Sequence, residues 1–178
     1  IIEADTVIEA TPTPETPVAP MDSLAMQKAR EEYATPTEPH KRMASEAGTW
    51  NEDLTFWMGP EDKNPQKYSA TAEIKMILGG RYQEQKHSGK VMGMDFEGVS
   101  TLAFNNASRE YTSTWIDNMA TGMMIATGKY DEKTKSMELK GDVVNPINGI
   151  KSPYREIYTI VDAATRKMEM FDVKNGSE

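Results

Sequence analysis

The sequence contains no cysteine and only two histidines, His40 and His87. The lack of cysteine excludes disulfides, thiol nucleophiles and cysteine-ligated zinc or iron–sulfur sites. A Ser-His-Asp triad would have to use one of the two histidines as its base. The chain also has no P-loop, no dinucleotide-binding glycine fingerprint and no G-x-S-x-G motif. We therefore expect no metal, no cofactor and no enzymatic activity.

Basic residues are scarce as well, with 20 Lys and Arg against 28 Asp and Glu and a net charge of −8. Residues 1–27 hold five acids and no base, which leaves −3 on the rest of the chain. Neither part offers the basic stripe that binding to phosphate needs, so we expect no nucleic-acid partner. No apolar run is long enough to span a bilayer.

Residues 1–21 form a leader rich in Pro, Thr and Glu, with four of the ten prolines of the chain. Such a segment buries too little apolar surface to fold and extends at ~3 Å per residue. Leaders of this composition commonly follow the lipidated cysteine of bacterial envelope lipoproteins. We expect a tether, possible lipid anchorage upstream, and a location in the periplasm or at the outer membrane or cell surface of a Gram-negative bacterium. A leader without any role is the alternative.

Two short helices are expected in residues 22–47. The first covers residues 22–34, with Asp22 or Ser23 as its N-cap, and ends at Thr35-Pro36 because proline lacks a backbone donor. The second runs from about residue 38 to 46, with Pro39 in its first turn. Both precede a β-rich body and could close one end of it.

From residue 48 onward the hydrophobic period changes from about 3.6 to 2. Six alternating positions of one strand are apolar or aromatic: Tyr68, Ala70, Ala72, Ile74, Met76 and Leu78. Further strands are expected near residues 49–58, 96–104, 111–115, 123–130, 136–143, 154–161 and 167–173. Eight or nine short strands with hairpin-length turns predict an all-β antiparallel up-and-down barrel over residues 48–178, because closure removes exposed sheet edges. A two-sheet sandwich is the alternative.

Several segments together resemble a known bacterial family. They read HKRMASEAGTW, AEIKMILGGRYQEQKHSGKVMGMDFEGVSTLAFNN, YTSTWIDNMATGMMIATGKYDEKTK, YREIYTIVD and KMEMFDVKNG. In one collinear order over residues 40–176, they resemble domain-of-unknown-function family 1579. The resemblance implies a calycin-like barrel, related in architecture to lipocalins and fatty-acid-binding proteins, and implies no reaction. The family pattern continues into one more strand, so we expect the barrel domain to lack a final strand, which either is missing or is supplied by another chain.

Arg155 is the first candidate ligand-binding residue, because an inward arginine in a small barrel often binds a carboxylate through its planar fork. Glu97, Asp117 or an acidic ligand could be its partner. An internal salt bridge or a position outside the barrel is the alternative. Trp115 and Asp117 share one strand face and could form an aromatic wall beside a polar anchor, or else pack in the core and cap a turn.

Arg81 and Tyr82 follow a Gly-Gly bend and are expected at the barrel rim, where they complete the candidate ligand-binding set. His87 precedes Ser88-Gly89, which looks like a hairpin end, so an exposed histidine is expected there. The 13 methionines include close pairs such as those of residues 92–94 and 168–170. Thioether pairs could bind Cu(I) or line a deformable cavity, or could simply fill the core.

These observations favour a non-enzymatic envelope barrel that binds a small apolar or amphipathic molecule in its lumen. An accessory structural subunit of a larger envelope or outer-membrane complex is the alternative. Weaker alternatives are a methionine-based copper binder and an enzyme that uses paired carboxylates such as Glu97 and Asp117.

Overall fold

The computed structural model describes residues 22–59 and 61–173. Two helices, α1 (Ser23–Ala34) and α2 (Glu38–Ala44), precede nine strands. The strands are β1 (Gly48–Phe56), β2 (Gln66–Ile77), β3 (Tyr82–Val91), β4 (Met94–Asn105), β5 (Glu110–Asp117), β6 (Met124–Asp131), β7 (Ser136–Val144), β8 (Lys151–Ile160) and β9 (Arg166–Asp172). The leader over residues 1–21 and any strand after residue 173 lie outside the described residues.

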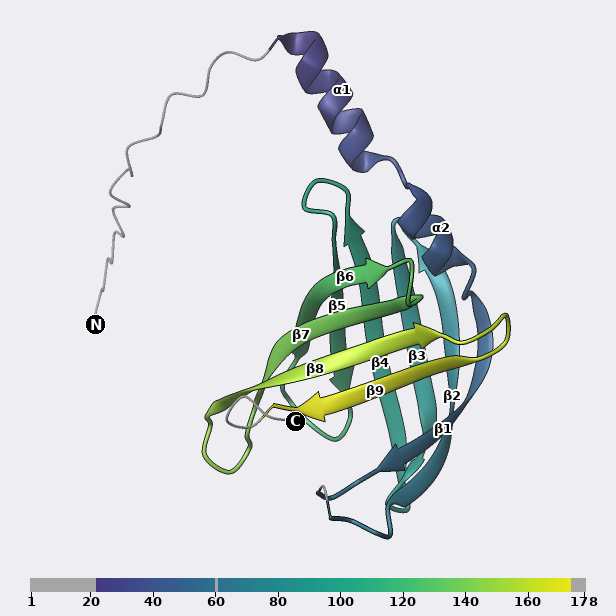
Figure 1. Cartoon of the computed structure of the whole chain (residues 1–178), viewed down its shortest axis with the longest axis vertical. Coiled ribbons are helices and arrows are strands. Elements are labelled where there is room, and N and C mark those ends of the chain that lie inside the picture. Colours follow the sequence, from purple (N-terminus) through teal and green to yellow (C-terminus); the bar gives the residue numbers. More distant parts are fainter. Residues whose placement is uncertain (1–21, 60, 174–178) are drawn as a thin grey trace, which may run out of the picture.

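The strands form a single antiparallel sheet in the order β1 to β9, with each strand paired to its neighbours in sequence. The sheet curls strongly, as Figure 1 shows, which confirms the expected all-β up-and-down architecture. In the part of the chain that the structure describes, β1 pairs with β2 and β9 pairs with β8, and no ladder joins β1 to β9. The result is a curled half-barrel with a concave face, a convex face and a seam between its end strands.

Helix α1 matches its predicted range, and α2 begins at the predicted residue but ends at Ala44, two residues earlier than expected. The Asp22 side chain accepts a hydrogen bond from Leu24 N at 3.2 Å and caps α1. None of the α1 side chains is buried, and the helix projects away from the sheet (Figure 1). Its C-terminal end is held by the Asn106 amide, which donates to backbone carbonyls including that of Thr35 at 2.8 Å. No helix in the described residues is long and apolar enough to cross a membrane.

The shorter helix α2 covers one end of the concave face. Its Met43 is 2% exposed and packs on the main apolar core. That core draws its other buried members from β4 to β8: Leu102, Phe104, Tyr111, Ala126, Met137, Leu139 and Tyr154. Gln83 is fully buried beneath the helix and donates its amide to the Met43 carbonyl at 2.8 Å. Packing therefore fixes α2 against the sheet and closes this end.

Strand β3 is the element that hydrophobic alternation does not reveal. Its concave-face positions include Gln83, Gln85 and His87, which are opposite Leu102, Ser100 and Gly98 of β4. Because both faces of β3 carry polar side chains, its sequence has no apolar rhythm. The preceding turn at Gly79 and Gly80 is visible in the sequence, and both glycines have the positive φ angles, 67° and 81°, that favour this residue.

Candidate functional site

The α2 end of the concave face is filled. The Arg42 guanidinium lies 3.8 Å from the Tyr130 ring centroid and donates to the Tyr111 hydroxyl at 3.1 Å. Arg42 also forms an ion pair with Glu132. The space left between α2 and the sheet is about 20 Å³, which is room for about one water molecule. This half of the face is therefore packed by side chains and leaves little space for a ligand.

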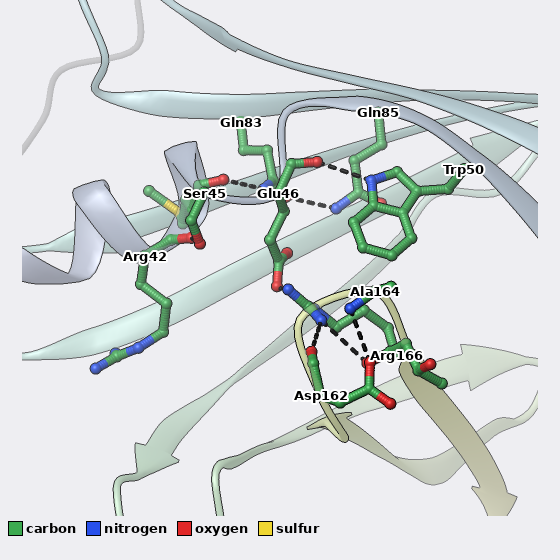
Figure 2. A network of polar contacts seen from close by, with 11 residues as sticks. Arg42, Ser45, Glu46, Trp50, Gln83, Gln85, Asp162, Ala164 and Arg166 are labelled. Carbon is green, nitrogen blue, oxygen red and sulfur yellow. Dashed lines mark hydrogen bonds and ion pairs between the residues drawn. The ribbon is translucent and has the colours of Figure 1, made fainter.

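Side chains close the seam between β1 and β9 at the same end (Figure 2). Glu46, which follows α2, accepts a bond from Arg166 Nε of β9 at 3.0 Å, and these side chains are 5% and 12% exposed. The Arg166 guanidinium lies 5.1 Å from the Trp50 ring of β1, and Trp50 Nε1 donates to the Glu46 carbonyl at 2.8 Å. Burial, together with the adjacent Glu46 carboxylate, raises the pKa of Tyr158 on β8. We call Glu46, Trp50, Tyr158 and Arg166 the seam clasp.

The other half of the concave face is open. Phe56 of β1 and Met168 and Met170 of β9 occupy concave-face positions, Met168 directly opposite Tyr158 of the seam clasp, yet they remain 47%, 56% and 48% exposed. Apolar side chains at the loops of this end are exposed as well, among them Trp57, Met58, Met92, Met94, Met119, Met123, Ile147 and Ile150. Exposed apolar side chains are therefore present both on the concave face and in the loops at this end.

A group of aromatic and ionisable side chains lies on this open half. It consists of Glu52 of β1, His87 of β3, Phe96 of β4, and Trp115 and Asp117 of β5, and we call it the aromatic–acid cluster. His87 Nδ1 is 3.0 Å from Glu52 Oε1, across β2. The two long side chains meet because the intervening concave-face residues of β2 are alanines.

Trp115 is the centre of the aromatic–acid cluster. Its ring lies 4.9 Å from the His87 ring and stacks on Phe96 at 6.2 Å. Gly98 leaves room for it, since a Cβ there would lie 2.6 Å from the indole. Trp115 Nε1 donates to Asp117 Oδ2 at 2.7 Å, and Asp117 Oδ1 accepts from the backbone of the following turn at 2.9 Å. Asp117 therefore caps the following turn, as one of the two alternatives predicted, and also holds the Trp115 indole.

The candidate residues from the sequence divide between the two faces. Trp115 and Asp117 lie on the concave face, as their shared alternation predicts. Arg155 lies on the convex face, where it pairs with Glu138 at 3.7 Å and stacks 4.8 Å from the Phe171 ring. The prediction of an inward Arg155 is therefore wrong, because the inward positions of β8 fall on its even-numbered residues, such as Tyr154, which is buried in the core.

Glu97 is exposed on the convex face of β4, since it is opposite Ser88 and out of phase with the inward Phe96. Glu97 and Asp117 therefore lie on opposite faces of the sheet and do not form a pair of carboxylates. Tyr82, on the convex face, and Arg81, in the preceding turn, are exposed at the α2 end, where Arg81 donates to the Leu78 carbonyl at 3.2 Å. Both are at a rim, but at the closed one.

Sequence reasoning missed His87 and Glu156. His87 was expected to be exposed in a hairpin end, but it lies within β3, its side chain is 11% exposed, and its Nε2 is buried with no hydrogen-bond partner. Glu156 of β8 is on the concave face between Leu139 and Met170, and burial raises its pKa. The signal for Glu156 was present, because this carboxylate alternates with Tyr154, which is buried, and Tyr158, which is partly buried.

The model of a protein family described as a protein of unknown function, DUF1579, matches residues 35–178. The match begins just after α1 and covers α2 and the whole sheet. No curated protein matches the chain.

Proposed function

Since the chain belongs to the DUF1579 family, for which no activity is described, we propose a function from the geometry of the sheet. The protein binds a small apolar or amphipathic molecule on the open half of the concave face and catalyses no reaction. The observation that carries this proposal is the exposure of Phe56, Met168 and Met170 at inward positions. Covering a fully exposed methionine or phenylalanine contributes about 1.5–3 kcal/mol. Half-exposed side chains would contribute about half of that each, and an apolar ligand would gain this energy.

Binding is tested by titration of the purified protein with the neutral fluorescent probe Nile red, beside native mass spectrometry of protein from its source for a bound small molecule. Met170→Lys and Ile125→Lys form a matched pair. Met170 faces inward and is 48% exposed, whereas Ile125 of β6 faces outward and is 51% exposed. We expect M170K to weaken binding about tenfold, since a charge replaces apolar contact, and I125K to leave it unchanged. Equal effects, or no binding by the wild type, would refute the proposal.

A second candidate, an accessory subunit of a larger envelope assembly, is supported by α1. This helix lies outside the family match, has no buried residue, and exposes Leu24 and Tyr33 at 72% and 58%. Removing residues 22–34 from the full chain should leave the stability of the sheet unchanged and should release the protein from its complex. Fractionation of native cells tests the envelope location, and a lone monomer on sizing of a native extract would contradict this candidate.

A further inference from the structure

Charge is divided unequally between the two faces of the sheet. Every lysine of the nine described strands alternates onto the convex face: Lys67, Lys75, Lys86, Lys90, Lys129, Lys140, Lys151 and Lys167. Arg155 also lies on the convex face. Arg166 is the one strand lysine or arginine on the concave face within the described residues, and Glu46 holds it in the seam clasp at the closed end. The open half therefore offers no free arginine or lysine from a described strand to an anionic ligand.

Carboxylates, by contrast, do face inward. Glu52, Asp117, Glu156 and Asp172 occupy concave-face positions. Glu52 is bound to His87, but the groups bound to Asp117 are the indole N–H of Trp115 and a backbone N–H. Both donors are neutral groups that fix the position of the Asp117 side chain.

The surroundings of Glu156 strengthen the field of its carboxylate when that group is ionised. Glu156 is flanked in the register by Leu139 and Met170, and its raised pKa has burial as its cause. A carboxylate beside apolar walls repels anions and attracts cations more strongly than one in bulk water. The rings of Trp115 and Phe96 on the same face can also take a cation against their π faces.

Resting on the proposed function, we infer that the ligand is a cationic amphiphile, with an apolar body and an amine or quaternary ammonium group, and that anionic amphiphiles of the fatty-acid type are rejected. The apolar body lies along Phe56, Met168 and Met170. The inward carboxylates, among them Asp117 and Glu156, attract the cation. An inward Arg155 would have predicted an anionic ligand. The structure places Arg155 on the convex face, and the expected charge of the ligand is therefore reversed.

Three probes of equal chain length test the inference by competition with Nile red: decyltrimethylammonium, decanol and decanoate. At pH 7 and low salt, decyltrimethylammonium should bind at least about tenfold more tightly than decanoate. The ratio of the two affinities should decrease as added salt screens the charges. Glu156→Gln and Asp117→Asn should each reduce the ratio of the affinity for decyltrimethylammonium to that for decanoate. Glu97→Gln, which removes a convex-face carboxylate, is the matched control and should leave it unchanged.

The outcomes separate this inference from the proposed function. Decanoate binding as tightly as decyltrimethylammonium overturns the charge preference but leaves ligand binding intact. Failure of all three probes and of Nile red refutes the proposed function, and the inference with it. A cation preference that persists in full in both E156Q and D117N overturns the assignment to these two carboxylates. Since the first comparison uses the wild-type chain, it stands whether or not a variant folds.

Discussion

Replacing Arg166 with methionine should destabilise the protein more than breaking a neighbouring, solvent-exposed ion pair. The substitution leaves the Glu46 carboxylate, 5% exposed, without its cation. Removing one partner of a buried ion pair costs about 3–5 kcal/mol. Because Arg166 itself keeps 12% exposure, some water can reach the site. We therefore expect about 3 kcal/mol, at the lower end of that range.

Urea unfolding, followed by far-UV circular dichroism, measures this cost, and the melting temperature should fall by about 6–12 °C. The double variant E46M/R166M should recover most of the loss, since replacing both partners with apolar groups is often close to neutral. The control is K167M on the next residue, whose ion pair with Glu169 has side chains 60% and 37% exposed. That change should cost under about 1 kcal/mol. If R166M costs no more than K167M, the seam clasp does not hold β1 to β9.

Three further predictions concern single positions. Gly98→Leu should displace the Trp115 indole, because a Cβ at residue 98 would lie 2.6 Å from the ring. We expect a shift in tryptophan fluorescence emission and about tenfold weaker binding of Nile red. The control Gly122→Ala, which has open space around its Cβ, should change neither the emission nor the binding. Gln83→Leu should cost about 1–3 kcal/mol in urea, since it removes the buried bond to the Met43 carbonyl and the acceptor of the Gln85 amide, and an unchanged urea midpoint would contradict that. Burial raises the pKa of Glu156, so the folded state holds its proton more tightly than the unfolded chain and stability falls as pH rises through the folded-state pKa. E156Q removes this pH-dependent loss of stability, so its urea midpoint should exceed that of the wild type at pH 7, and the two midpoints should be equal below about pH 4. A lower midpoint for E156Q than for the wild type at pH 7 would contradict the prediction.

Local rules were sufficient for most elements of the fold. Asp22 and Pro36 delimit α1, and the alternation from Tyr68 to Met76 predicts β2 and which residues share one face, whereas Leu78 lies in the following turn. The same alternation placed Trp115 and Asp117 together. In each case the information lies within a few residues of the chain, where period and capping chemistry apply.

The candidate site was harder to predict, because alternation gives two faces without saying which is inside. Arg155 shares a face with Ile157, whose apolar side chain suggested the interior, but the buried Tyr154 shows the interior to be the other face. The contact of Glu52 with His87 spans a whole strand, and its visible signal is the pair of alanines beneath it. Glu46 and Arg166 are 120 residues apart, so no local pattern links them.

The order of the strands has a consequence for how the chain folds. Each of the eight ladders joins consecutive strands, so each can form as a hairpin, at the small entropic cost of closing a short loop. The bond from Arg166 to Glu46 instead closes a loop of 120 residues. We expect the sheet to form one hairpin after another, with the contact between its end strands, β1 and β9, forming last. The shape of the binding face is then fixed only in the final step of folding.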